Sequence, residues 1–332
     1  MSARASVVAR AVGRLAGRLL TKAPTLLLVI GVSFLLLKLA PGDLATAMAG
    51  DAGAASPEYM AMLRRQYGLD QSVWLQFWHY IANLARLDFG YSFRNSMPVL
   101  DLIADRVPAT LLLVATSILV ALAAGVSLGV WAAYRQGRWI DTAISTLSTV
   151  GFALPLFWVG LLLIILLAVE LRWLPSGGLA TTGFDGGLWA GLLDRLRHLA
   201  LPAFTLSLFY IAIYARIVRT TAAEVLHSEY LRTARAKGLR PARILWRHVL
   251  RNCLLPVATL TGLELGTLLG GVVTIETVFS WPGMGRLAFD AVTYRDMNLL
   301  MGILVWSAVL ISATNLVLDS LYTLIDPRVV AR

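Results

Sequence analysis

The chain has 332 residues, a mean hydropathy of +0.72 and only 14% charged side chains. A soluble domain carries about a quarter charged residues, so a water-soluble globule is excluded and lipid is the expected solvent. The formal net charge of +10 would suit a nucleic-acid partner, but the cations lie in loops without a recognition module. We therefore expect an all-α integral membrane protein whose partner is membrane lipid and not nucleic acid.

The residue inventory also argues against catalysis and cofactor binding. The only lysines are Lys22, Lys38 and Lys237, and none precedes Ser or Thr, so the sequence contains no P-loop for ATP. The single cysteine, Cys253, permits no internal disulfide and no cysteine metal cluster. The four histidines form no HExxH zinc motif. We expect no catalytic residue and no metal site in this chain.

Six segments are apolar and long enough to cross a bilayer core of about 30 Å as helices. Pro108 and Pro202 are expected near helix starts, where a missing N–H is tolerated. Pro155 lies inside its segment and should kink it or mark an offset start. The predicted spans are approximately 23–41, 109–133, 147–169, 199–219, 253–279 and 299–324.

The first span has two interpretations. Residues 1–22 form a basic leader, and Ala47-Met48-Ala49 resembles a cleavage site, as in a signal peptide. The charge distribution favours a retained span instead. With both termini cytoplasmic, the cytoplasmic parts hold 18 of the 29 Lys and Arg residues against four acids, which is the positive-inside asymmetry.

The external segment 42–108 is expected to contain one or two short amphipathic helices. Ser56 has the chemistry of an N-cap, and Pro57 suits the first helical position. The aromatic residues Trp74 and Trp78 suit packing and anchoring at the membrane interface, or a docking surface for an external partner. The sequence leaves both roles open.

The most distinctive cytoplasmic feature is the loop at about 223–252. Its residues from Glu224 to Lys237 favour helix, and Gly238 suits the C′ position because glycine accepts positive φ. Pro241 suits the first position of a second helix, which should run into the fifth span. The small Ala234 and Ala236 would let another protein approach closely. From these residues alone, a solvated loop and a docking element both remain possible.

The fifth span contains the most suggestive membrane-embedded residues. Gly262, Gly266 and Gly270 recur every four residues, which favours close helix packing or the lining of a translocation path. Glu264 lies deep in the apolar segment, so it should face a cavity, a partner or the bundle interior. Glu276, near the outer end, could serve as a gate or as a structural bond.

The loop sequence TARAKGL, followed by RHVLRN, resembles the EAA loop of ABC-importer permeases, and in particular the dipeptide/oligopeptide group. It departs from the common pattern, since 232–234 read Arg-Thr-Ala instead of Glu-Ala-Ala and 250–251 read Leu-Arg instead of Leu-Pro. Further stretches resemble the same group in the same order, and the resemblance runs from about residue 25 to the end. They are LAPGD at 39–43, LDFGYSFRNSMPVLDLIADRVPATL at 87–111, LPLFWVGLLLI at 154–164, ETVFSWPGMGRL at 276–287 and IDPRV near the C-terminus.

The resemblance implies a type I ABC-importer permease fold in a prokaryotic inner membrane. Residues 109–332 would form the core permease domain, with five spans and a cytoplasmic coupling-helix loop. The implied partners are a second homologous permease, two cytoplasmic ATPase subunits that carry ATP and Mg²⁺, and an external substrate-binding protein. This chain would bind no cofactor itself. The residues expected to couple to the ATPase are Thr233, Ala234, Arg235, Ala236, Lys237, Gly238, Leu239 and Pro241.

The implied function is import of di- or oligopeptides by alternating access. Relatives of this group also carry nickel complexes, glutathione-like peptides or oligosaccharides, and these remain alternatives. An intramembrane enzyme or an unrelated channel is the alternative outside the class. Neither of these predicts the turn at Gly238.

Overall fold

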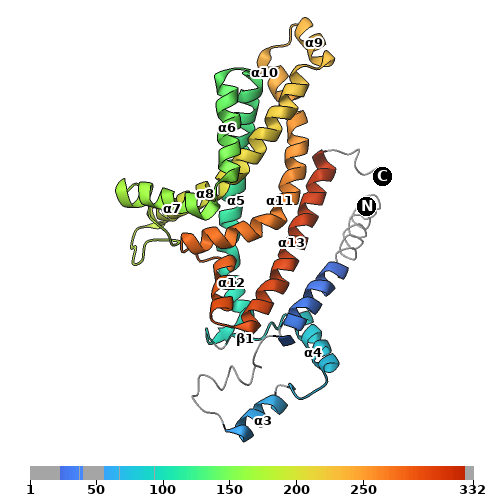
Figure 1. The fold of residues 1–332 in the computed structure, drawn as a ribbon, viewed down its shortest axis with the longest axis vertical. Coiled ribbons are helices and arrows are strands. Elements are labelled where there is room, and N and C mark those ends of the chain that lie inside the picture. The colour runs from blue at the N-terminus through green and yellow to red at the C-terminus, as the bar shows by residue number, and fades with distance from the viewer. Residues whose placement is uncertain (1–22, 37, 40–55, 67, 93, 326–332) are drawn as a thin grey trace, which may run out of the picture. The chain divides into compact units, whose positions relative to one another are not determined.

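The computed structural model describes residues 23–36, 38–39, 56–66, 68–92 and 94–325, without the side chains of Leu63, Gln66, 263–271 and 317–325. The described chain is mostly helical, as expected (Figure 1). It forms two compact units, residues 1–105 with 288–317 and residues 106–287 with 318–332. Each unit has its own packing.

The first unit joins the N-terminal part of the chain to a C-terminal helix. Its elements are the helix Ala23–Leu36, α3 (Pro57–Gln66), α4 (Val73–Ala85), β1 (Tyr91–Ser92), β2 (Met97–Pro98), the start of α5, most of α12 (Met284–Thr293) and most of α13 (Met297–Ile325). The two strands pair antiparallel, with Tyr91 opposite Pro98. The ring of Phe34 lies 5.2 Å from that of Phe77 and 5.9 Å from that of Tyr80, so α4 packs its aromatic face on the first apolar helix.

The predicted start of the external helices is confirmed. The Tyr59 N–H donates to the Ser56 hydroxyl oxygen at 3.3 Å, and Pro57 is the first residue of α3. Ser56 therefore satisfies one of the N–H groups that a helix start leaves without an internal partner. The aromatic Trp74 and Trp78 of α4 are 67% and 49% exposed, which leaves both predicted roles open.

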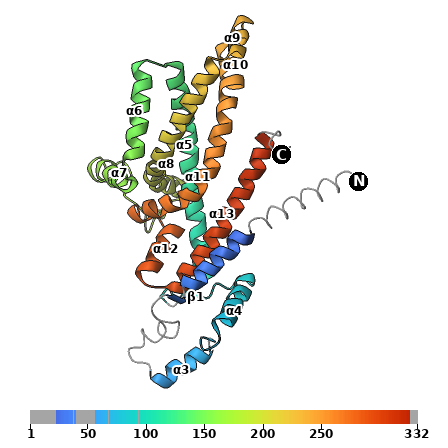
Figure 2. The same ribbon diagram turned by 45° about the vertical axis from the view of Figure 1, so that its right-hand side comes forward.

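The second unit is the helical bundle that carries the candidate site. Figures 1 and 2 show α5, α6, α8 and α11 side by side, with α9 and α10 beyond their ends. The elements are most of α5 (Val99–Tyr134), α6 (Trp139–Ala153), α7 (Leu156–Leu163), η1 (Ile164–Glu170), α8 (Leu188–Leu226), α9 (Glu229–Ala236), α10 (Pro241–Ile244), η2 (Leu245–Val249), α11 (Leu250–Val278) and the start of α12 (Met284–Thr293). The buried core lies between α5, α8 and α11 and includes Tyr214, Leu206 and Ile275.

Three of the described helices are long and apolar enough to cross a membrane: Val99–Tyr134, Leu188–Leu226 and Met297–Leu316. A fourth span results if α6 and the α7–η1 pair, which are bent by 105°, cross together. The predicted first span coincides with the shorter apolar helix Ala23–Leu36. The predicted fifth span lies on α11, where residues 263–271 have no described side chains.

The prolines test the expected helix boundaries. Pro155 begins the sharp bend between α6 and α7, which confirms the predicted break. Pro108 and Pro202 were expected at helix starts, and this prediction is wrong, because both lie inside helices α5 and α8. The flanking segments Val99–Val107 and Leu188–Leu201 continue each helix beyond its apolar part. Hydropathy marks the bilayer-crossing portion and not the first helical turn.

Two glycines set the distance between α5 and α8. A Cβ placed on Gly129 would lie 2.6 Å from the Ala215 carbonyl oxygen, and one on Gly125 would lie 2.7 Å from the Tyr214 Cβ. Gly125 and Gly129 form a GxxxG pair, the spacing that lets two membrane helices approach closely. The sequence prediction placed this packing only in the fifth span and missed it here.

Replacing Gly129 by alanine should destabilise the bundle, because the new methyl group meets a backbone oxygen that cannot rotate away. Overpacking of this kind costs about 1–3 kcal/mol. The thermal unfolding midpoint in detergent should fall by several degrees. The matched control is Gly191→Ala, because Gly191 lies in the facing helix α8 and has no atom within 4 Å of the added Cβ. An equal loss of stability in both variants would contradict the packing role of Gly129.

Candidate functional site

The turn that was predicted after Lys237 is present. Gly238 has φ +72°, its N–H donates to the Arg235 carbonyl at 2.9 Å, and the Leu239 N–H donates to the Ala234 carbonyl at 3.2 Å. This pair of bonds is a Schellman motif, which ends α9 and needs a residue that accepts positive φ at C′. Pro241 is the first residue of α10, as predicted. The sequence therefore predicted the local geometry of this turn correctly.

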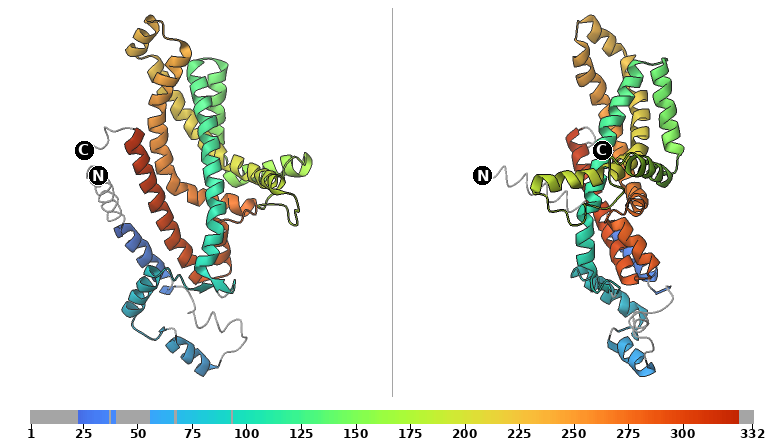
Figure 3. Two further views of the ribbon diagram at one scale, coloured as in Figure 1. Left: turned by 180° about the vertical axis from the view of Figure 1, so that it is seen from behind. Right: turned by 90° about the vertical axis from the view of Figure 1, so that its left-hand side faces the viewer.

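The start of α9 differs from the prediction. Glu224 to Lys237 was expected as one helix, but α8 ends at Leu226 and α9 begins at Glu229. The Ser228 hydroxyl donates to the Val225 carbonyl at 2.6 Å and so satisfies a terminal group of α8. The short break redirects the chain, and α9 and α10 form a hairpin-like tip beyond α8 and α11 (Figure 3).

The predicted coupling residues fall into two groups. Ala234 is 7% exposed and packs, with the fully buried Leu231, in the chain's own core, while Leu239 is half-buried. The remaining residues face outward and would be available to a partner. They are Thr233, Arg235, Ala236, Lys237, Gly238 and Pro241. The tip thus has an anchored inner face and an exposed outer face.

The chain continues from the tip directly into α11. Helix α10 is followed by the π-helical η2 and then by α11 without a break, as the sequence predicted for the second helix of the loop. Within this stretch Ile244 and Val249 are buried in the core. Arg243, Arg247 and Arg251 are exposed on the outside. A displacement of the tip would therefore pass into α11 on one side and into α8 on the other.

An ion pair joins α6 to α8 near the tip. The Arg219 guanidinium donates to both carboxylate oxygens of Asp141, with the Nη2–Oδ2 distance at 2.9 Å. The Gly137 N–H donates to the same carboxylate at 3.0 Å, and Asp141 is only 4% exposed. Nothing in the sequence identified the partner of Asp141, which is one of the four acids in the predicted cytoplasmic parts. Its position at the start of an apolar segment was the available signal.

Removal of Arg219 should destabilise the bundle, because the carboxylate of Asp141 would stay buried without its cation. The Arg219 side chain is 33% exposed, so the expected cost is about 1–3 kcal/mol and not that of a fully buried pair. The expected result for Arg219→Ala is a clear loss of thermal stability in detergent. Arg216→Ala is the control, since Arg216 is an exposed arginine one turn earlier on α8. If both variants unfold at the same temperature, the ion pair does not stabilise the fold.

Glu276 lies in a closed hydrogen-bond network. Its side chain is fully buried, its Oε1 accepts from the Thr110 hydroxyl at 2.6 Å, and its Oε2 accepts from the Arg286 N–H at 3.0 Å. The Thr110 hydroxyl oxygen in turn accepts from the Met284 N–H at 2.8 Å. Glu276 therefore links α11, α5 and the first turn of α12. The sequence analysis named Glu276 without naming Thr110 as its partner.

A close contact further restrains this network. A Cβ on Gly283 would lie 1.9 Å from the Oε1 of Glu276, so only glycine leaves room for the carboxyl group. The Trp281 indole N–H donates to the Ala109 carbonyl at 3.0 Å beside it. Both observations suit the structural bond, one of the two roles predicted for Glu276.

The other residues that were predicted to line the path or pack between helices lie on α11. Gly262 is half-buried on α11. Gly266 and Gly270 lie in the same helix, but the side-chain surroundings of 263–271, including Glu264, lie outside the described residues. The choice between close packing and path lining at these positions stays a prediction.

The sequence matches two family models. Residues 125–331 match the binding-protein-dependent transport system inner membrane component, and residues 12–114 match the N-terminal region of such membrane components. Together the two matches cover nearly the whole chain.

Curated relatives match along nearly their whole length. The oligopeptide transport system permease protein AppB of Bacillus subtilis is 40% identical over 317 residues, which cover 94% of this chain and 97% of AppB. The glutathione transport system permease protein GsiC of Escherichia coli K12 is 39% identical over 312 residues, with 94% and 97% covered.

A solved structure has the same fold. A chain of the inward-facing MetNI methionine ABC transporter matches with a TM-score of 0.53 and 18% identity, over 68% of this chain and 96% of that chain. At this identity the likeness concerns the fold alone. The family models and the relatives together show that this chain belongs to the inner membrane components of binding-protein-dependent transport systems.

Proposed function

We propose that the chain is a permease subunit of an ATP-driven importer that carries di- or oligopeptides across the inner membrane. The observation that carries the proposal is 40% identity over almost the full length to an oligopeptide permease. A glutathione-type tripeptide is the second candidate substrate, supported by the 39% identical glutathione permease. Nickel complexes and oligosaccharides have no comparable support.

The proposal includes the partners and the topology. A second homologous permease would complete the path, two ATPase subunits would bind ATP and Mg²⁺, and an external protein would deliver the substrate. This chain would have six spans, with a cytoplasmic leader at 1–22, an external segment at 42–108 and a core permease domain at 109–332. Both termini would be cytoplasmic, in agreement with the positive-inside asymmetry.

The proposed coupling surface is the outer face of the α9–α10 tip. Arg235, Lys237 and Gly238 are exposed there, while Leu231 and Ala234 hold the inner face in the core. An ATPase that grips the outer face would therefore move the tip together with α8 and α11. Such a rigid movement could change which side of the membrane the path faces, without chemical change to the substrate.

The substrate class is tested by identifying the ligand of the external binding protein and then measuring uptake. The whole transporter would be reconstituted with its binding protein, and the molecules that co-purify would be identified by mass spectrometry. We expect di- or oligopeptides, whose uptake requires ATP and is reduced by competing peptides. Uptake of a nickel complex or an oligosaccharide, with no uptake of any peptide, would overturn the proposed substrate.

A further inference from the structure

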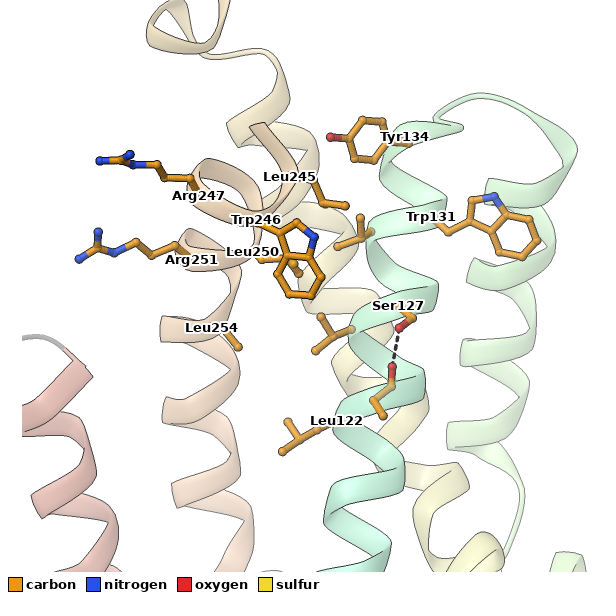
Figure 4. Close-up of a pocket in the computed structure, with 13 residues that line it drawn as sticks. Leu122, Ser127, Trp131, Tyr134, Leu245, Trp246, Arg247, Leu250, Arg251 and Leu254 are labelled. Carbon is orange, nitrogen blue, oxygen red and sulfur yellow. Dashed lines mark hydrogen bonds between the residues drawn. The ribbon is translucent and has the colours of Figure 1, made fainter. Parts of the chain in front are cut away.

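A groove runs between α5 and the η2–α11 stretch, close to the α9–α10 tip. Its cavity volume is about 990 Å³ (Figure 4). Leu122, Val126 and Val130 line it from α5, and Leu250 and Leu254 line it from α11. Its walls are thus mostly aliphatic and suit a hydrocarbon ligand.

The hydroxyl of Ser127, which lines the groove, already has a hydrogen-bond partner within the chain. The Ser127 hydroxyl donates to the Ala123 carbonyl of its own helix at 2.6 Å, as the dashed line in Figure 4 marks. An acyl chain could therefore lie against this wall while that hydroxyl keeps its hydrogen-bond partner.

The length of the groove fits one leaflet of a bilayer. From Leu122 to Tyr134 helix α5 advances by 12 residues, or about 18 Å at 1.5 Å per residue. Half of a bilayer core of about 30 Å is about 15 Å. A single acyl chain of one leaflet would therefore span the groove from its mouth to its inner end.

The mouth of the groove carries hydrogen-bond donors. Figure 4 shows the Trp246 ring between the two helices, with its nitrogen on the side of Tyr134, and the Tyr134 ring directed from α5 toward the same opening. Trp246 is 71% exposed and Tyr134 is 45% exposed. Arg235, on α9, adds positive potential at the Tyr134 phenol.

These mouth groups have no partner within the part of the chain that the structure describes. The side chains of Tyr134, Trp246 and Arg235 form no hydrogen bond or ion pair there. Arg247 and Arg251 also line the groove, and their side chains point away from α5 in Figure 4, so they add positive potential beside it. Two neutral donors beside a cation suit a phosphate group.

We propose that the groove binds an anionic phospholipid of the cytoplasmic leaflet, with one acyl chain along α5 and the phosphate at Tyr134 and Trp246. The cytoplasmic orientation of this end rests on the proposed function. An apolar helix from a partner subunit would fill the groove but leave the mouth donors without acceptors, whereas a lipid phosphate satisfies them. Since Trp246 lies in η2, directly after α10, the lipid would contact the segment that joins the coupling tip to α11.

The test uses the complete transporter and phosphatidylglycerol as the probe. After delipidation, phosphatidylglycerol or phosphatidylcholine would be titrated in, and retained lipid would be counted by native mass spectrometry. Two variants distinguish binding of the lipid's acyl chain from binding of its headgroup. Ala123→Trp fills the groove, and Tyr134→Phe combined with Trp246→Phe removes both neutral donors. Trp139→Ala is the control, since Trp139 is 78% exposed and lies outside the groove lining.

We expect Ala123→Trp to lose one retained phosphatidylglycerol relative to the wild type and to Trp139→Ala. The double phenylalanine variant should bind phosphatidylglycerol at least about fivefold more weakly, because two hydrogen bonds to a charged group are lost. Its retention of phosphatidylcholine should fall as well, because phosphatidylcholine carries the same phosphate group.

Two outcomes would overturn the lipid site. One is wild-type retention of phosphatidylglycerol by Ala123→Trp. The other is loss of the second permease from the Ala123→Trp complex with lipid retention unchanged, which would make the groove a subunit interface. Lipid retention is measured without any transport assay. A negative lipid result therefore does not contradict the proposed peptide import, and a negative uptake result does not affect the measured lipid retention.

Discussion

Replacing Gly238 by valine should abolish substrate uptake while the protein still inserts and assembles. Gly238 has φ +72°, and a residue with a Cβ in the left-handed region costs roughly 1–2 kcal/mol, most for a β-branched side chain. The tip should then abandon the Schellman turn, and the native turn should become about tenfold rarer. Uptake and substrate-stimulated ATP hydrolysis in proteoliposomes should both fall by that factor or more.

The chain provides a matched control for this strain. Gly183, in the loop between η1 and α8, has φ +73°, and like Gly238 it has no atom within 4 Å of an added Cβ. Gly183→Val therefore carries the same backbone cost away from the proposed coupling surface, and its uptake should stay near the wild-type rate. Gly238→Asn should also keep most of the uptake, because asparagine tolerates this conformation. Equal losses in the two valine variants would show that strain alone, and not the tip, explains the defect.

Helix caps, breaks and turns could be predicted from the sequence. Ser56 before Pro57, the break at Pro155, and Gly238 followed by Pro241 were all predicted correctly, because each depends on a backbone preference within a few residues. Side-chain hydrogen-bonding and allowed φ values act over that distance, so no knowledge of the rest of the fold is needed.

Side-chain contacts between residues that are distant in the sequence could not be predicted. Thr110 meets Glu276 across 166 positions, and Arg219 meets Asp141 across 78. Nothing in the spacing of either pair identifies the other residue, because the partner is set by how whole helices pack. The same limit explains why Ala234 looked like a slim docking surface. Its small side chain is what lets α9 pack into the core.

The hydropathy pattern also concealed where helices begin. The apolar part of α5 starts near Ala109, yet the helix starts at Val99, ten residues earlier. In the first turns Asp101 and Asp105 are exposed while Leu102 and Ile103 are buried, and a search for long apolar segments ignores such an amphipathic stretch. Pro108 then looked like a first residue although it is preceded by more than two helical turns.

The two roles predicted for Glu276, a gate and a structural bond, can be distinguished by removing its buried hydrogen bonds. Replacing Glu276 by alanine removes the acceptor of the Thr110 hydroxyl and of the Arg286 N–H inside the fold. Buried donors without partners cost about 1–3 kcal/mol each, so we expect a loss of about 3 kcal/mol. The thermal midpoint in detergent should fall by at least about 5 °C. Glu170→Ala, which removes an exposed carboxylate of η1, should leave it unchanged.

A double-mutant cycle assigns that loss to the network. Thr110→Val removes the hydroxyl that bonds Glu276, so the double variant should lose less stability than the sum of the two single variants. Residues that share a hydrogen bond differ from additivity by about 0.5–3 kcal/mol. A gate predicts another pattern, in which Glu276→Ala keeps the wild-type midpoint but changes uptake or substrate-independent leak. That pattern would reject the structural bond, because a carboxyl group buried among three elements cannot be removed without cost if its bonds hold those elements together.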